Sequence, residues 1–135
     1  MIEFNFKSQT ATTREQSQRL ISLGLRKETA DMMHYMNGWG VLATPWRDYH
    51  EGYKCYYPAW SLSRLWELTP KVIFTKPSLY LTMYEDSVVY CAGDNNEEYE
   101  KSFSRQRSLF DNIIDCIEWL IKEGYFNKEY LEIKD

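Results

Sequence analysis

The chain has 135 residues, 27% of them charged, and a formal net charge of −4. A length of this order is typical of one domain that buries a sizeable core without disulfides or metals, so we expect a single domain over residues 1–135. Binding to phosphates requires a cationic surface, and the acidic balance therefore argues against a nucleic-acid partner. Aromatic residues make up 16% of the chain, an excess that suits both core packing and binding surfaces.

The chain shows no sign of export or membrane insertion. Glu3 and Lys7 interrupt the N-terminal residues, unlike a secretory signal. The longest apolar-rich segment, residues 109–121, is too short and too charged to span a bilayer. Three widely spaced cysteines form neither a disulfide framework nor a CxxC motif. We expect a cytoplasmic protein with reduced thiols and no membrane partner.

The N-terminal third predicts one strand and two helices. Residues 2–6 alternate apolar and polar side chains, as a half-buried strand does. Thr12 and Thr13 each offer a helix cap, with Glu or Gln three residues later to close a capping box. This helix is expected to stop at Gly24, since glycine tolerates the left-handed conformation that ends helices. A short second helix is predicted in residues 27–33.

Residues 34–58 are expected to form an irregular loop, because Gly and Pro leave little room between them for regular elements. The segment nevertheless holds two Trp, five Tyr, both His and one Cys. The favoured interpretation is that these aromatics pin the loop onto the domain as a satellite core. The other is that they line a binding site. The candidate binding residues here are Trp39, Trp46 and His50.

A third helix is predicted over residues 61–69. Ser61 is a suitable N-cap, and Trp60 and Leu65 have the spacing of a hydrophobic staple. Pro70 helps to end the helix. Each conspicuous residue of this stretch therefore has a structural role, and none suggests chemistry.

The next segments predict an antiparallel sheet. Residues 71–75, 79–84 and 87–92 are rich in β-branched and aromatic side chains, which favour strands. Their short connections predict hairpins. Residues 98–103 alternate as a fourth strand would.

The last element is an amphipathic helix over residues 109–123, capped by Ser108 and ended by Gly124. On a helical wheel its apolar residues share one face, suited to packing on a sheet. Trp119 falls on the opposite, polar face beside residues such as Asn112. Two interpretations stay open: the C-terminal tail or the aromatic loop covers Trp119, or Trp119 anchors a partner or subunit interface.

Catalytic and metal motifs are largely missing from the sequence. There is no phosphate-binding glycine loop and no serine nucleophile elbow. The enzyme hypothesis that remains is a thiol nucleophile, Cys55, activated by His50 or His34. The spacing of these residues is not that of a metal site. We predict no catalytic residue, no metal and no cofactor.

Two motifs carry a family resemblance: "TTREQSQRLISLGLRKETADM" (12–32) and "PAWSLSRLWELTPKVI" (58–73). They resemble a family of small proteins from anaerobic gut bacteria and from their phages and mobile elements. The resemblance covers most of the chain, although Trp66 and Thr69 stand where smaller or aliphatic residues are expected. It implies a bacterial, phage-derived or mobile-element protein, and it transfers no activity.

Together these patterns predict an α+β fold. An antiparallel sheet of three or four strands would be packed by the C-terminal amphipathic helix and two shorter helices. The favoured function is a non-enzymatic interaction or accessory protein that binds a protein partner or itself. The alternative is a small-molecule-binding protein or hydrolase with a pocket in the aromatic loop of residues 34–58. Binding through Trp39, Trp46, His50 and Trp119 is the site prediction.

Overall fold

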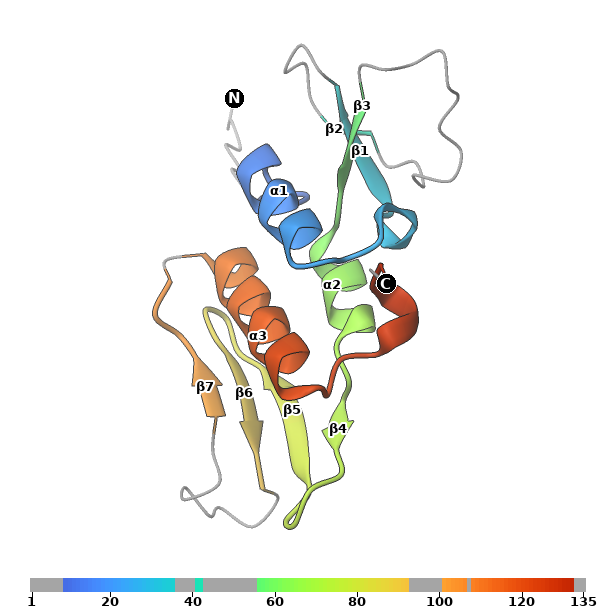
Figure 1. Cartoon of the computed structure of the whole chain (residues 1–135). Helices are drawn as coiled ribbons and strands as arrows, with labels where there is room; N and C mark the ends of the chain where they lie inside the picture. Colours follow the sequence, from blue (N-terminus) through green and yellow to red (C-terminus); the bar gives the residue numbers. More distant parts are fainter. Residues whose placement is uncertain (1–8, 36–40, 43–55, 93–100, 107, 133–135) are drawn as a thin grey trace, which may run out of the picture.

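The computed structural model describes residues 9–35, 41–42, 56–92, 101–106 and 108–132 (Figure 1). It confirms the predicted α+β class, with helices packed on antiparallel sheets. The predicted strand at residues 2–6 lies outside the described residues. Within the described ranges no helix has the length and apolar character needed to cross a membrane.

A four-stranded antiparallel sheet forms the lower half of the molecule in Figure 1, with strand order β4-β5-β6-β7. Its strands are β4 (Val72–Ile73), β5 (Leu79–Met83), β6 (Val88–Cys91) and β7 (Lys101–Phe103). Each lies inside one of the four segments predicted as strands. Sequence neighbours pair throughout, and the connections from β4 to β5 and from β5 to β6 are short, as hairpins require.

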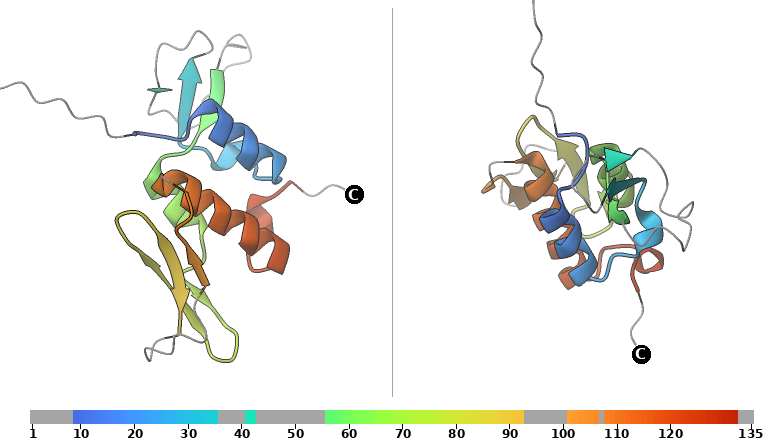
Figure 2. Two further views of the ribbon diagram at one scale, coloured as in Figure 1. Left: turned by 90° about the vertical axis from the view of Figure 1, so that its left-hand side faces the viewer. Right: turned by 90° about the horizontal axis from the view of Figure 1, so that it is seen from above.

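Helix α3 (Leu109–Glu123) has the predicted bounds. The Ser108 side chain accepts a hydrogen bond from the Phe110 N–H, and Gly124 ends the helix in the left-handed region at φ 77°. The helix packs against β6 and β7. In Figure 1 and in the left view of Figure 2 it lies against one face of the four-stranded sheet.

The main hydrophobic core lies between α3 and this sheet. Fully buried side chains of α3, such as Ile113 and Ile117, belong to the same cluster as Val88 and Tyr90 of β6. Burial of each such aliphatic side chain contributes about 1.5–3 kcal/mol to the free energy of folding. The Tyr90 hydroxyl donates to the Pro70 carbonyl at 2.6 Å, so its polar end is satisfied.

Helix α1 (Arg14–Ser22) begins with the predicted capping box at Thr13. The Gln16 N–H donates to the Thr13 hydroxyl, and the Thr13 N–H donates to the Gln16 side-chain oxygen. Leu20 of this helix is fully buried in the main core. Helix α1 contacts both α3 and β3 (Tyr56–Ala59), and therefore joins the two halves of the molecule.

Helix α2 (Leu62–Leu68) also begins where predicted. The Ser61 hydroxyl accepts from the Arg64 N–H and donates to the Asp31 carboxylate. Trp60 and Leu65, the predicted staple pair, are both fully buried in the main core. The Trp60 indole N–H donates to the Thr29 hydroxyl at 2.9 Å. The conspicuous motif therefore has the structural role that its sequence indicates.

The prediction of an irregular segment over residues 34–58 was wrong at both ends. A second, three-stranded antiparallel sheet of order β2-β1-β3 is formed by β1 (Met32–Tyr35), β2 (Val41–Leu42) and β3. The spacing of Gly and Pro reports only on sequence neighbours, whereas Met32 pairs with Ala59, far along the chain. Pro58 is tolerated because β3 is an edge strand, where a missing N–H costs no ladder hydrogen bond.

The prediction of a short helix over residues 27–33 was also wrong beyond the first turn of that helix. A 3₁₀ turn, η1 (Lys27–Thr29), is followed by the extended residue Ala30 and then by β1. Pairing of β1 with β3 outweighs the weak local helix propensity here. After α3, a second 3₁₀ turn, η4 (Lys128–Tyr130), packs the C-terminal segment back toward Arg26, whose N–H donates to the Tyr130 carbonyl.

Candidate functional site

Of the four predicted binding residues, the described structure places Trp119 alone. Trp39, Trp46 and His50 lie outside the described residues, as does Cys55. The predicted pocket of the aromatic loop therefore has no described geometry.

Trp119 is half-buried in an aromatic cluster at the side of α3. Its ring centroid lies 6.0 Å from Tyr90, 5.8 Å from Phe103 and 5.7 Å from Tyr125. Such separations suit tilted aromatic pairs, which stabilise by about 0.5–1.5 kcal/mol each. The Lys101 ammonium lies 5.8 Å from the Trp119 ring. Trp119 thus packs on the sheet and on the segment that follows α3, in agreement with the interpretation that the C-terminal tail covers it.

Asn112, predicted on the same polar face, is fully buried. Its Nδ2 donates to the carbonyl oxygens of Asp86 and Gln106, and its Oδ1 accepts from the Gln106 N–H at 2.9 Å. The hairpin between β5 and β6 and the segment before α3 close over this end of the helix. The helical wheel misses this because the covering groups are backbone atoms from other parts of the chain.

Exposed aromatic side chains lie on the outer face of the four-stranded sheet at Tyr80 of β5, and at the ends of two strands at Phe74, which follows β4, and Tyr84, which follows β5. Exposed fractions are 88% for Phe74, 49% for Tyr80 and 55% for Tyr84. Along β5, Leu79, Leu81 and Met83 pack against the main core, so the alternate residues face away from α3. We call Phe74, Tyr80 and Tyr84 the outer aromatic face.

The sequence carried a signal for this face that the prediction did not use. Residues 79–84 are apolar or aromatic at five of six positions, whereas a strand with one solvated face alternates between apolar and polar side chains. Strands that are apolar on both faces are usually covered on both faces.

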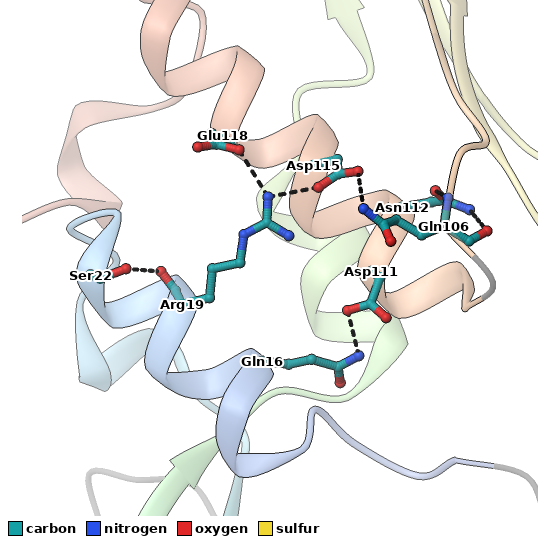
Figure 3. A network of polar contacts seen from close by, with 8 residues as sticks. All are labelled: Gln16, Arg19, Ser22, Gln106, Asp111, Asn112, Asp115 and Glu118. Carbon is teal, nitrogen blue, oxygen red and sulfur yellow. Dashed lines mark hydrogen bonds and ion pairs between the residues drawn. The ribbon is translucent and has the colours of Figure 1, made fainter.

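A hydrogen-bonded network joins α1 to α3 (Figure 3). One guanidinium nitrogen of Arg19 lies 2.6 Å from Asp115 and 2.8 Å from Glu118. Burial lowers the pKa of Arg19, but hydrogen bonds to these two carboxylates and their charges outweigh it, and the net shift is upward. Gln16 donates to Asp111 at 2.8 Å. Every group of this network has a partner, which indicates a structural role.

The hollows on the described surface include the following three. A mainly apolar one of about 330 Å³ lies between α2 and β5, lined by Leu62, Ser63, Trp66 and Met83. One of about 390 Å³ lies beside the network of α1 and α3, lined by Thr13, Glu15, Gln16, Arg19 and Asp111. One of about 250 Å³ follows β7 and is lined by Lys101, Ser102, Phe103, Ser104, Arg105 and Asp115. We call the third the β7 groove.

Two of the described groups that could act as nucleophile or base, Cys116 and His34, are held in structural positions. Cys116 is fully buried, and burial together with the charge of Asp115 raises the pKa of its thiol to about 12. A thiol of this kind forms little nucleophilic thiolate at neutral pH. His34 lies on β1 with its Nε2 hydrogen-bonded to the Thr12 carbonyl. A carbonyl oxygen only accepts, so Nε2 carries the proton.

Within the described part of the chain, no three His, Cys, Asp or Glu side chains cluster as metal ligands would. Comparison with known proteins adds no relative: no protein-family model, no curated protein and no solved structure matches this chain.

Proposed function

We propose that this chain is a non-enzymatic interaction or accessory protein that binds a protein partner through the outer aromatic face. The observation that carries the proposal is the exposure of Phe74, Tyr80 and Tyr84 on a sheet whose other face is packed by α3. Large aromatic side chains left in water are costly to solubility, and they are enriched at the centres of protein interfaces. The family resemblance supports a bacterial setting, on a phage or a mobile element.

The chemistry of the described residues supports binding over catalysis. The Cys116 thiol is buried, and the carboxylates of the network between α1 and α3 are bound to Arg19 and Gln16. The Ser61 hydroxyl donates to the Asp31 carboxylate, but the same oxygen accepts from the Arg64 N–H as the N-cap of α2, which is a structural role.

Site-specific photocrosslinking in the source cells tests this proposal. A photoreactive phenylalanine analogue replaces Tyr80 in one sample and Lys27, an exposed residue of η1, in the control. We expect a crosslinked protein adduct from position 80 that is missing from position 27, and a similar adduct from position 84. Equal or no crosslinking at the three positions would refute binding through this face. An adduct of twice the mass of this chain would identify a second copy as the partner.

A further inference from the structure

The last strand of the sheet, β7, has a free edge among the described residues. It pairs with β6 on one side and is the end of the strand order β4-β5-β6-β7. Figure 1 draws β7 as the leftmost strand, and the left view of Figure 2 looks onto this side of the molecule. Alternate backbone N–H and C=O groups of an edge strand point outward, ready to pair with another strand.

The β7 groove runs along this edge. Five consecutive residues line it, beginning with Lys101 at the start of β7 and ending with Arg105, and Asp115 of α3 forms its other wall. The groove thus follows the three residues of β7 and the two residues after it, with a helix beside it. Peptides that add a strand to a sheet edge are bound in grooves of this form.

The charge of the groove is positive, although the chain is acidic overall. Within the described residues neither Lys101 nor Arg105 forms an ion pair. The Lys101 ammonium lies 5.6 Å from the Phe103 ring and 5.8 Å from the Trp119 ring, which orients it without neutralising it.

The one carboxylate of the groove is already engaged. Asp115 forms an ion pair with Arg19 through one oxygen, at 2.6 Å, and accepts from the Gln106 side chain through the other, at 3.2 Å. Two cations and the hydroxyls of Ser102 and Ser104 are left to meet a ligand. These groups are complementary to carboxylates.

We propose that the edge of β7 binds an extended acidic segment of a partner protein, which adds to the sheet as a fifth strand. The proposal rests on the proposed function in that the ligand is a protein, and it names a contact separate from the outer aromatic face. A second copy of this chain fits the edge poorly, because pairing two β7 strands would bring both copies' Lys101 and Arg105 together. Like charges on adjacent strands destabilise their pairing.

The test uses the full chain and a fluorescent heptapeptide that alternates threonine and glutamate. We expect binding by fluorescence anisotropy at low ionic strength, together with shifts of the backbone amide NMR signals of residues 101–106. A version with lysine in place of glutamate should not bind. A version with proline in place of threonine keeps the charge but lacks alternate N–H donors, and it should bind at least about tenfold more weakly if the contact is strand addition.

Charge reversal tests whether the acidic peptide binds at the edge of β7. The double variant Lys101→Glu/Arg105→Glu should lower affinity for the acidic peptide about tenfold or more, as the loss and reversal of two exposed charge pairs imply. Lys27→Glu/Lys128→Glu changes the net charge equally at exposed positions elsewhere and should leave affinity within about twofold. If the reversed protein does not fold, Lys101→Gln/Arg105→Gln replaces it, with an expected loss of about threefold.

Any of three results would overturn the proposal. The amide shifts could be confined to residues outside 101–106, or the proline peptide could bind as tightly as the threonine peptide. The two charge-reversed double variants could also lose equal affinity for the acidic peptide. Tyr80→Lys separates this inference from the proposed function. It removes an exposed ring of the outer aromatic face and should leave peptide binding at β7 unchanged. If the photoreactive analogue at position 80 gives no adduct while the acidic peptide still binds at β7, the proposed function is refuted and the β7 proposal stands.

Discussion

The two sheets of this protein are held in different ways. The four-stranded sheet packs against α3 through a continuous core that includes Val88, Tyr90 and Ile117. Among the described residues, the three-stranded sheet contributes to a much smaller cluster of Met32, Ala59 and Ala11. Burial of apolar area dominates folding stability, so the four-stranded half should carry most of the free energy of unfolding.

The three-stranded half is held mainly by polar and backbone contacts. Thr12 is fully buried, its N–H donates to the Trp60 carbonyl, and its hydroxyl accepts from the Trp60 N–H at 3.0 Å. Asp31 accepts from both the N–H and the hydroxyl of Ser61. Such bonds fix geometry but contribute about 1 kcal/mol each in net stability. From this contrast we expect the four-stranded half to supply most of the stability and the three-stranded half to be positioned by it.

The largest expected effect comes from opening the main core. Ile117→Ala removes a fully buried side chain of α3, and we expect a loss of about 4 kcal/mol in the free energy of unfolding, because both transfer energy and packing are lost. Urea unfolding followed by circular dichroism measures it.

Met32→Ala is the matched control in the smaller cluster. Its two cluster neighbours are alanines, so fewer contacts are lost, and a decrease of about 2 kcal/mol or less is expected. Equal losses in the two variants would contradict the difference between the halves and would indicate a single, evenly distributed core.

A smaller loss should follow from Asn112→Ala. This substitution leaves the Asp86 and Gln106 carbonyl oxygens and the Gln106 N–H without their buried partner. We expect a decrease of about 2 kcal/mol, since unsatisfied buried polar groups keep their desolvation cost. Thermal unfolding gives the value. Asp111→Ala, one residue earlier on a half-buried position, should cost clearly less. If it costs as much, the buried amide is not what holds the hairpin to α3.

Sequence reasoning succeeded where the determining contacts are local. The bounds of α3, the caps at Thr13 and Ser61, and the hairpins of the four-stranded sheet all depend on residues within a few positions of each other. It failed for β1 and β3, whose pairing joins Met32 to Ala59.

The same limit applies to the surface. A helical wheel assumes that a helix packs against a single neighbouring element on one of its faces. Helix α3, however, is contacted by the four-stranded sheet, by α1 and by α2. Asn112 was misplaced for this reason, and the wheel alone did not show that side chains of the sheet also contact Trp119. The outer aromatic face could have been inferred from the apolar character of both faces of β5. The β7 groove could not, because Asp115 and Arg105 meet only after α3 docks.

Alkaline pH offers a probe of the larger core, read through Cys116. Burial raises the pKa of Cys116 to about 12, from an ordinary value of 9.0, and burial also raises the pKa of Tyr90. A group whose folded pKa is raised stabilises the fold below its unfolded pKa, and that stability is lost as pH rises toward the folded value. Between pH 8 and pH 10 we expect Cys116 to account for a decrease of about 1 kcal/mol.

Urea unfolding at several pH values tests this prediction by comparing the wild-type protein with the variant Cys116→Ala. The variant starts less stable because of its cavity, so the slope with pH is the quantity to compare. A shallower decrease above pH 9 is expected in the variant. Parallel curves for the two proteins would show that the thiol ionises as readily in the fold as in the unfolded chain.

The smallest expected effect tests the link between the two halves. Arg19 belongs to α1, which contacts β3, and its guanidinium pairs with Asp115 and Glu118 of α3. About a third of the Arg19 side chain is exposed, so solvent screens the pair, and Arg19→Gln should cost about 0.5–1 kcal/mol. Adding 1 M NaCl should reduce the difference from wild type, because salt screens partly exposed charges.

Arg26→Gln is the control for this link. Arg26 pairs with Glu28 at 3.6 Å on the exposed surface of the same half, and its loss should change the free energy of unfolding by less than about 0.3 kcal/mol. Hydrogen exchange then locates the effect. If α3 clamps the smaller half through Arg19, amides of α1 and β1 should exchange faster in Arg19→Gln while those of β6 keep their protection. Uniform acceleration across both halves would instead show that they unfold as one unit.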